Sequence, residues 1–256
     1  MVVTLRLTKH EGWGNDFLVL SDPQHRERVT PELARRLCDR RFGIGADGLL
    51  HLSKQDVRAD LTMTLHNADG SPAEMSGNGL RCLVQAALLG GWTPAGGTIT
   101  VSTAAGYRSA LVAKTGNPYV HDIRVDMGPV LIEGNDEDDM LLNVGNPHRV
   151  RRVPDPATYD LAAAGAVHPD VNLEVIAADG ADTIKMRVHE RGAGETLACG
   201  TGACAVAVAA SKWGLVTGPL VTVRQPGGDA AVDITDTDQV HLAGPVSYIG
   251  SIEVPE

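Results

Sequence analysis

Two short segments of the chain share one pattern at a constant separation of 123 residues. Residues 76–79 read Ser-Gly-Asn-Gly, residues 199–202 read Cys-Gly-Thr-Gly, and each segment runs on into a mostly apolar stretch. Glycines at such positions permit a tight turn, and an apolar run that follows one is typical of a buried helix. The repeat therefore predicts two related halves with matched turn-to-helix junctions. The first position of the pattern is a hydroxyl in one copy and a thiol in the other.

Charge and cysteine content exclude several classes of partner. The chain has 256 residues, a formal net charge of −10 and no basic cluster, so nucleic acid and anionic membranes are not expected partners. Four cysteines in a chain of this length do not form a disulfide framework. The first residues show no secretory signal, and no apolar run in the sequence is long and uniform enough to span a bilayer. We expect a cytoplasmic protein.

Hydrophobic periodicity predicts many short strands and few helices. A helix is expected from Pro31, with Thr30 as its N-cap, and two further helices cover residues 77–89 and 200–213. A helix that is apolar on all sides must be buried, so each half should be a sheet curled around one central helix. The strands are expected at residues 2–7, 17–20, 49–52, 61–66, 98–101, 109–112, 121–126, 184–189, 220–223, 231–234 and 240–243.

The two junctions also suggest a chemistry. The N-terminus of a helix presents free N–H groups and the positive end of its dipole, so it binds a carboxylate well. The side chain before the Gly-x-Gly would lie beside the bound group. A cysteine there should have a lowered pKa and could exchange protons with a carbon acid. Two such groups on opposite faces of one α-carbon would invert its configuration.

Simpler interpretations exist for the same residues. Ser76 could only cap its helix, a contribution of about 1 kcal/mol. Free cysteines are commonly small core residues, and we interpret Cys38, Cys82 and Cys204 in this way. For Cys199, glycines directly after it favour a place at a site over core packing.

No metal or cofactor is expected. Neither glycine-rich segment is a Walker sequence or a complete G-x-G-x-x-G. His189-Glu190 lacks the second histidine of a zinc-binding helix, and no cysteine pair has C-x-x-C spacing.

Taken together, the motifs resemble the diaminopimelate epimerase family, cofactor-independent enzymes of the proline-racemase-like group that interconvert LL- and meso-diaminopimelate. The resemblance spans nearly the whole chain, and the motifs together are far more specific than any one of them. They are residues 12–17 (GWGNDF), 42–48 (FGIGADG), 67–71 (NADGS), 77–82 (GNGLRC), 145–148 (GNPH), 190–196 (ERGAGET) and 198–202 (ACGTG).

The resemblance implies an α/β (α+β) fold of two pseudo-symmetric domains, each a curled mixed or antiparallel sheet around a central helix. The expected domains are residues 1–115, which residues 247–256 could join, and residues 116–246, with the active site in the cleft between them. A turn-rich stretch at residues 114–118 is consistent with this boundary. The resemblance also implies a homodimer.

The resemblance assigns roles residue by residue. Cys199 matches one catalytic thiol, and His148 resembles a histidine beside a catalytic cysteine. The backbone N–H groups of four residues match the cradle of the reacting carboxylate: Gly77, Asn78, Gly200 and Thr201. Glu190 and Asn15 resemble contacts to the reacting end, and the distal amino-acid end resembles the one held by Arg191, Asn67, Asn146 and Asn172. A guanidinium and amides suit such a zwitterionic end, although asparagine is also common in turns.

Ser76 departs from the family pattern, which has its second catalytic cysteine here. A hydroxyl is a poor proton abstractor without a dedicated base, so the chain should be an impaired epimerase. Either Ser76 replaces a cysteine and silences the enzyme, or it is a natural variant with altered chemistry, such as another amino-acid racemase, a hydroxyproline-type dehydratase or a non-catalytic amino-acid-binding relative. Arg191 and the asparagines favour diaminopimelate. Gly48 stands where some relatives have glutamine, which removes one polar contact.

Overall fold

The computed structural model describes residues 4–22, 29–94, 96–236 and 238–255. The chain divides into two compact units: unit 1 is Met1–Val125 with Pro245–Glu256, and unit 2 is Asp126–Gly244. The turn at residues 114–118 thus lies inside unit 1. It joins two strands that pair with each other as far as Ala110 and Val125, and this pairing keeps residues up to Val125 in the first unit.

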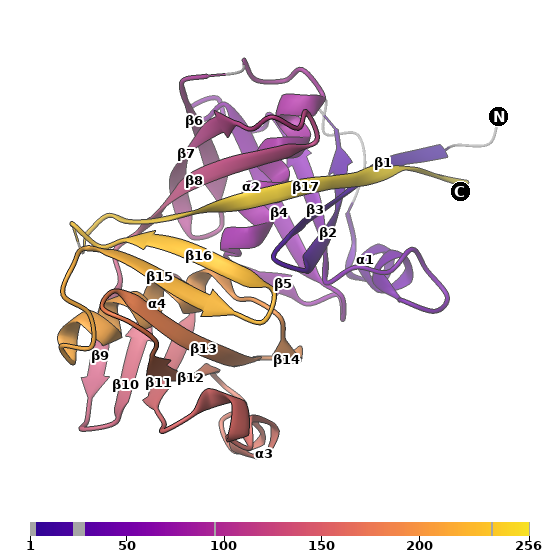
Figure 1. The fold of residues 1–256 in the computed structure, drawn as a ribbon. Helices are drawn as coiled ribbons and strands as arrows, with labels where there is room; N and C mark the ends of the chain where they lie inside the picture. The colour runs from indigo at the N-terminus through magenta and orange to yellow at the C-terminus, as the bar shows by residue number, and fades with distance from the viewer. Residues whose placement is uncertain (1–3, 23–28, 95, 237, 256) are drawn as a thin grey trace. The chain divides into compact units, whose positions relative to one another are not determined.

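Unit 1 is a ring of strands around one helix (Figure 1). Pairing runs β17–β1–β2–β3–β4–β6–β7–β8, and β8 pairs with β17 to close the ring. Pairs β2–β3 and β4–β6 are parallel, whereas β1–β17, β1–β2, β3–β4, β6–β7 and β7–β8 are antiparallel. The strands are β1 (Thr4–Gly12), β2 (Asn15–Ser21), β3 (Gly48–Ser53), β4 (Leu61–Asn67), β5 (Pro72–Ala73), β6 (Thr98–Thr103), β7 (Gly106–Lys114), β8 (Val120–Gly128) and the long β17 (Val240–Pro255), whose first residues belong to unit 2.

Helix α2 (Gly77–Leu89) fills the middle of unit 1 and packs on β1, β2, β3 and β4. Its first eleven residues are buried, which confirms the helix predicted at residues 77–89. Three of them are polar, Asn78, Arg81 and Gln85, and all three are buried. A second helix, α1 (Pro31–Cys38), begins as predicted, because the Thr30 side chain accepts a hydrogen bond from the N–H of Leu33.

Unit 2 repeats the plan with different strand lengths. Its strands pair in the order β9–β10–β11–β12–β13–β15–β16–β17, with β14 added to β13. Pairs β11–β12 and β13–β15 are parallel. The strands are β9 (Leu131–Asn135), β10 (Asp139–Asn143), β11 (Pro147–Arg152), β12 (Asn172–Ala178), β13 (Thr183–Glu190), β14 (Gly194–Thr196), β15 (Leu220–Gln225) and β16 (Gly228–Asp233); η1 (Pro156–Thr158) and α3 (Leu161–Ala166) precede β12.

Helix α4 (Gly200–Lys212) is the buried centre of unit 2 and contacts β10, β11, β12, β13, β15 and β16. Residues 200–210 are all buried, as an all-apolar run predicts. Each unit is therefore a curled sheet around a central helix, and the predicted fold class is confirmed. The strand predicted at residues 2–7 starts at Thr4, and residues 2 and 3 lie outside the described part.

Within the described ranges, no helix combines the length and apolar character needed to cross a bilayer. Cys38, Cys82 and Cys204, all within the described ranges, are buried as expected of core cysteines, and none of the three forms a disulfide.

Candidate active site

Ser76 is the N-cap of helix α2 in unit 1. Its backbone is extended (φ −142°, ψ 119°), and its Oγ accepts a hydrogen bond of 3.0 Å from the N–H of Gly79. Gly77 and Asn78 are the first two helical residues, and N–H groups at these positions have no intrahelical acceptor. Ser76 therefore acts as a helix cap in this structure, and the two N–H groups beside it are suited to bind an anion.

A hydrogen-bonded row of amides supports this junction. Asn78 donates from Nδ2 to Oδ1 of Asn15 at 3.1 Å, and Asn15 donates from Nδ2 to the Asp47 carboxylate at 2.7 Å. The Oδ1 of Asn78 accepts from the buried guanidinium of Arg81 at 2.7 Å. That guanidinium also stacks 3.7 Å from the ring centre of Trp13, in the β1–β2 turn. The orientation of both amides is thus set within unit 1.

Asn67 ends strand β4 and pairs with Gly48 of β3. Its Nδ2 donates to the Ser71 hydroxyl at 3.0 Å, and its N–H donates to the Ser71 carbonyl at 2.9 Å. The turn that follows β4 therefore fixes this side chain.

Cys199 is the N-cap of helix α4 in unit 2, the same position that Ser76 occupies in unit 1. Its backbone is likewise extended (φ −129°, ψ 116°), and its Sγ accepts from the N–H of Gly202 at 3.3 Å. The N–H of Cys199 donates to Oε1 of Gln225 at 2.8 Å. Gly200 and Thr201 begin the helix, so the two junctions match in geometry as the repeat predicts.

Contacts among four side chains lead from the sulfur of Cys199 to Glu174 in strand β12. The Thr201 hydroxyl lies 3.4 Å from Sγ and 3.4 Å from Nδ2 of Asn146. The Oδ1 of Asn146 lies 2.9 Å from Nε2 of His148, whose Nδ1 lies 2.7 Å from Oε1 of Glu174. His148 and the Glu174 side chain are buried. In these contacts His148 is linked to the Cys199 sulfur through Asn146 and Thr201.

The prediction of a lowered pKa for Cys199 is wrong. Burial raises the pKa of this thiol well above its ordinary value, and the carboxylates of Glu190 and Glu174 raise it further. Hydrogen bonds from Thr201 and Gly202 lower the pKa but are outweighed. The sequence pattern revealed the helix N-terminus and could not reveal two acidic side chains on neighbouring strands.

Glu190 ends strand β13 and accepts a hydrogen bond from the Thr196 hydroxyl. Burial raises the pKa of Glu190, while the hydrogen bonds from Thr196 and Cys199 oppose that rise. The next residue, Arg191, donates its N–H to Oδ1 of Asn172 at 3.0 Å. Asn172 also donates to the carbonyl of Pro147 at 3.1 Å. Unit 2 thus gathers Glu190, Arg191 and Asn172 in one hydrogen-bonded segment.

Four supporting residues were missed by the sequence analysis: Glu174, Gln225, Asp47 and Arg81. A signal existed for two of them. Arg81 interrupts the apolar run of α2, and Glu174 interrupts the apolar run of β12. A single charge in such a run indicates a buried polar group that needs a partner. Gln225 and Asp47 lie at turn-like positions where their residue types are common and carry no such signal.

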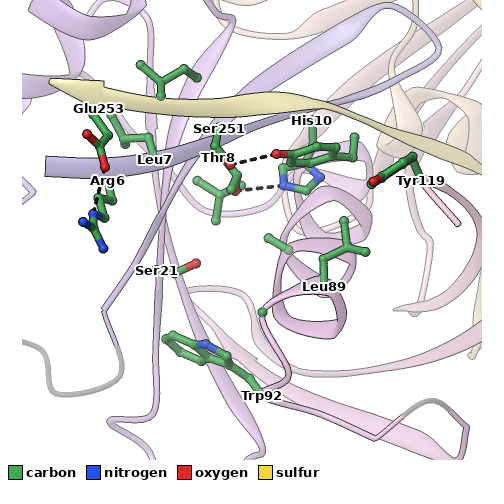
Figure 2. Close-up of a pocket in the computed structure, with 15 residues that line it drawn as sticks. Arg6, Leu7, Thr8, His10, Ser21, Leu89, Trp92, Tyr119, Ser251 and Glu253 are labelled. Atoms are coloured by element: carbon green, nitrogen blue, oxygen red, sulfur yellow. Dashed lines mark hydrogen bonds and ion pairs between the residues drawn. The ribbon is translucent and has the colours of Figure 1, made fainter.

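A pocket of about 710 Å³ lies elsewhere in unit 1 (Figure 2). It is lined from β1, β2, β17 and the end of α2, and His10 donates or accepts at 2.9 Å from Thr8 at its edge. None of the predicted site residues lines it. In the described part of the chain, no group of three or more His, Cys, Asp or Glu side chains is placed to hold a metal ion.

Solved structures share this fold. A hydroxyproline epimerase from Agrobacterium vitis superposes with a TM-score of 0.73 at 15% identity, covering 98% of this chain and 91% of that one. A phenazine biosynthesis protein from Bacillus anthracis gives 0.74 at 15% identity, covering 98% and 99%. At this identity the likeness concerns the fold alone, and it assigns the chain to the mixed α/β fold that these two proteins share.

Sequence comparison narrows that class to one family. The diaminopimelate epimerase family model matches residues 7–132 and 140–249. A diaminopimelate epimerase from Desulfitobacterium hafniense is 38% identical over 276 residues, covering 96% of both chains. One from a Picosynechococcus species is 38% identical over 289 residues, covering 98% of this chain and 99% of its own. The chain belongs to the diaminopimelate epimerase family.

Proposed function

We propose that the chain acts on diaminopimelate by proton transfer at an α-carbon, with Cys199 as the proton-exchanging group. The observation that carries the proposal is the thiol at the N-cap of α4, beside two helix N–H groups and next to Glu190. A carboxylate held by the N–H groups of Gly200 and Thr201 would place its α-carbon near the sulfur. No cofactor is needed for such a transfer.

Glu190 has a second role in this proposal. Its carboxylate lies near Cys199 and raises the pKa of the thiol. The α-ammonium of an amino acid would pair with Glu190 and offset that charge, which would favour thiolate formation when substrate is bound. Substrate would thereby help to generate the base that attacks it.

The distal end of the substrate also carries an ammonium and a carboxylate. Arg191 supplies a guanidinium for planar carboxylate recognition, and Asn146, Asn172 and Asn67 supply amides that donate and accept. The main-chain contact between Arg191 and Asn172 ties the segment after β13 to β12, which supports a shared role. We propose these four residues as the distal subsite, and Asn15 with the N–H groups of Gly77 and Asn78 as the contribution of unit 1 to the reacting end.

Ser76 limits the reaction that the chain can perform. Its hydroxyl caps helix α2 by accepting a hydrogen bond from the N–H of Gly79. Among the described contacts in unit 1, it has no hydrogen bond to a histidine or carboxylate that could act as its base. Inversion requires a proton donor on the face opposite Cys199. We therefore propose that epimerisation is impaired and that a cysteine at residue 76 restores it.

Proton NMR of LL- and meso-diaminopimelate in heavy water tests the proposal. The chain and its Ser76→Cys variant are compared at equal concentration. Epimerisation should rise by about 10²–10⁴ in Ser76→Cys, which is the usual worth of a positioned acid or base. A Ser76→Cys, Cys199→Ala double variant serves as the matched control and should lose the gain. A folded Ser76→Cys protein that leaves both isomers unchanged would overturn the proposed function.

We also propose a cytoplasmic homodimer. The four free cysteines support a reducing compartment. Light scattering coupled to size exclusion measures the mass, and a single species of one chain would contradict the dimer.

A further inference from the structure

We propose that Glu174 is a positioning residue that sets the direction of a hydrogen-bond chain ending on the Cys199 sulfur. It acts through three side chains in turn: His148, Asn146 and Thr201. The inference rests on the proposed role of Cys199 as a proton-exchanging group and does not depend on the identity of the substrate.

Glu174 lies directly beneath the first turn of helix α4. Its side chain is fully buried in strand β12. A Cβ on Gly202 would come within 2.6 Å of Oε1, so the carboxyl can occupy this place only because residue 202 is glycine. Burying a carboxyl in an apolar strand is costly unless it is hydrogen bonded. His148 provides that bond at 2.7 Å.

The pair of Glu174 and His148 fixes which ring nitrogen carries a proton. Burial raises the pKa of Glu174 and so favours a carboxyl O–H over a carboxylate. A carboxyl O–H can donate to Nδ1, 2.7 Å away, and a neutral ring that accepts at Nδ1 has its N–H at Nε2. An N–H at Nε2 can donate to the Oδ1 of Asn146, which only accepts. The amide of Asn146 is thereby oriented.

The orientation then passes to the thiol. With Oδ1 engaged, Asn146 presents Nδ2 to the Thr201 hydroxyl at 3.4 Å. Since that oxygen accepts from the amide, its own hydrogen is free to point at Sγ, also 3.4 Å away. A donor on the sulfur favours the thiolate and opposes the effects of burial and of Glu190. If the same hydrogen bonds ran in the opposite direction, the thiol would donate to the Thr201 hydroxyl, and this would favour the protonated thiol over the thiolate.

At the equivalent described positions, unit 1 has no such polar pair. Strand pairing matches Phe17 with Gly48 in β2–β3, and His148 with Asn172 in β11–β12. Both are parallel pairs that precede the central helix of their unit. Phe17 therefore occupies the position equivalent to His148, and Leu50 the position equivalent to Glu174; both are buried apolar residues. Of the two described junctions, the one that carries a thiol has the polar pair beneath it, and the one that carries a hydroxyl has Phe17 and Leu50 there.

Alkylation of Cys199 by iodoacetamide, followed by peptide mass spectrometry between pH 6 and 10, tests the inference without substrate. The other three cysteines are at most 2% exposed and report little. The titratable groups around the thiol are Glu190, Glu174 and His148. The variants are Glu174→Met, which keeps the volume, Glu174→Gln, which can still donate to Nδ1, and Thr201→Val.

The direction of the hydrogen-bond chain from Glu174 to the sulfur predicts a different alkylation rate for each variant. Glu174→Met and Thr201→Val should each slow alkylation at pH 7 about tenfold, equivalent to a rise of about one unit in the thiol pKa. Glu174→Gln should stay within about threefold of the parent. The double variant Glu174→Met, Thr201→Val should be no slower than either single one, because both act through the same hydroxyl.

Opposite results would overturn the inference. If Glu174 acted only by its charge, both substitutions at residue 174 would leave the rate unchanged or raise it. If it acted only by packing, its effect would add to that of Thr201→Val, to about a hundredfold. Should Glu174→Met not fold, a His148→Phe, Glu174→Leu variant copies the apolar pair of unit 1, and an unchanged rate there overturns the inference equally. No diaminopimelate turnover by a folded Ser76→Cys variant, with the alkylation pattern intact, would reject the proposed function alone.

Discussion

The two helix junctions match in backbone and differ in what lies beneath them. Ser76 and Cys199 are both extended N-caps that accept from the N–H three residues ahead. In unit 2 the strands below the junction carry His148 and Glu174, whereas in unit 1 the equivalent places hold Phe17 and Leu50. The described halves thus share the geometry of a helix N-terminus, which suits an anion, and of these two junctions only the one in unit 2 has titratable side chains on the strands beneath it.

The helices differ in the opposite sense. Helix α2 carries buried Arg81 and Gln85, while the residues 123 positions later in α4 are Cys204 and Val208. Arg81 donates a hydrogen bond that orients Asn78, and its guanidinium stacks on the ring of Trp13. In unit 1 the buried polar side chains orient amide groups, whereas in unit 2 they surround a thiol. Residue 76 therefore lies in the unit whose buried polar groups are not placed to assist proton transfer.

Isotope exchange by the parent chain gives the sharpest test of this asymmetry. With only Cys199 competent, a proton should leave and return on one face of the α-carbon. In heavy water, deuterium should enter one of LL- and meso-diaminopimelate while the two isomers interconvert about 10²–10⁴ times more slowly than with Ser76→Cys. Proton NMR and mass spectrometry separate exchange from inversion. Exchange that survives Cys199→Ala would assign the chemistry to another group.

Removal of Arg81 should damage unit 1 far more than removal of its counterpart damages unit 2. Arg81→Met leaves the Oδ1 of Asn78 and the carbonyl of Pro245 without their donors. Two orphaned buried acceptors cost roughly 4 kcal/mol in unfolding free energy. The matched Cys204→Ala removes one sulfur and should cost about 1 kcal/mol. Urea unfolding measures both, and equal losses would refute the difference between the helices.

Acid should destabilise unit 1 through His10. Burial lowers the pKa of His10 from 6.5 to about 4, although a hydrogen bond with Gln85 opposes the shift. Between pH 6.5 and 4, His10 therefore binds a proton in the unfolded chain but stays neutral in the folded chain. The stability that is present above pH 6.5 is lost as the pH falls toward 4. The loss is about 3 kcal/mol. His121 also contacts Gln85, and its pKa is lowered too, so the contribution of His10 is isolated by difference. His10→Gln should flatten the fall in melting temperature over this window, and an unchanged slope would exclude His10 as its source.

Much of this architecture could be predicted from the sequence, because it depends on local signals. The paired glycines indicated both junctions, and the apolar runs indicated helices α2 and α4 within a residue of their bounds. Thr30-Pro31 indicated the start of α1. In each case the signal and the structure lie within a few residues of each other.

The rest depends on partners distant in the sequence. Strand β11 reads Pro-His-Arg-Val-Arg-Arg and shows no apolar alternation, yet it pairs with β10 and β12. Arg149 and Arg151 are held there by Asp139, and a lone basic segment does not indicate that carboxylate. The raised pKa of Cys199 is similar, since Glu174 and Glu190 come from two other strands. Contacts between residues far apart in the sequence therefore determine both the strand β11 and the raised pKa of Cys199.

The smallest effect compares the second glycine of each junction. A Cβ on either glycine would meet the Cβ of its N-cap residue, Ser76 or Cys199, at the same tight 3.2 Å, so this contact does not distinguish the two junctions. Beneath the turn, a Cβ on Gly79 would meet a methyl of Leu50 at 3.5 Å, which is ordinary packing. A Cβ on Gly202 would meet Oε1 of Glu174 at 2.6 Å and would push the carboxyl away from His148. Alanine is also the better helix former by up to about 1 kcal/mol. Gly79→Ala should therefore be nearly neutral, while Gly202→Ala should cost about 1–2 kcal/mol by overpacking and also slow alkylation of Cys199. Denaturation and alkylation of the two variants, measured together, test whether the two junctions differ beneath an identical turn, and equal behaviour would mean that the carboxyl of Glu174 moves freely.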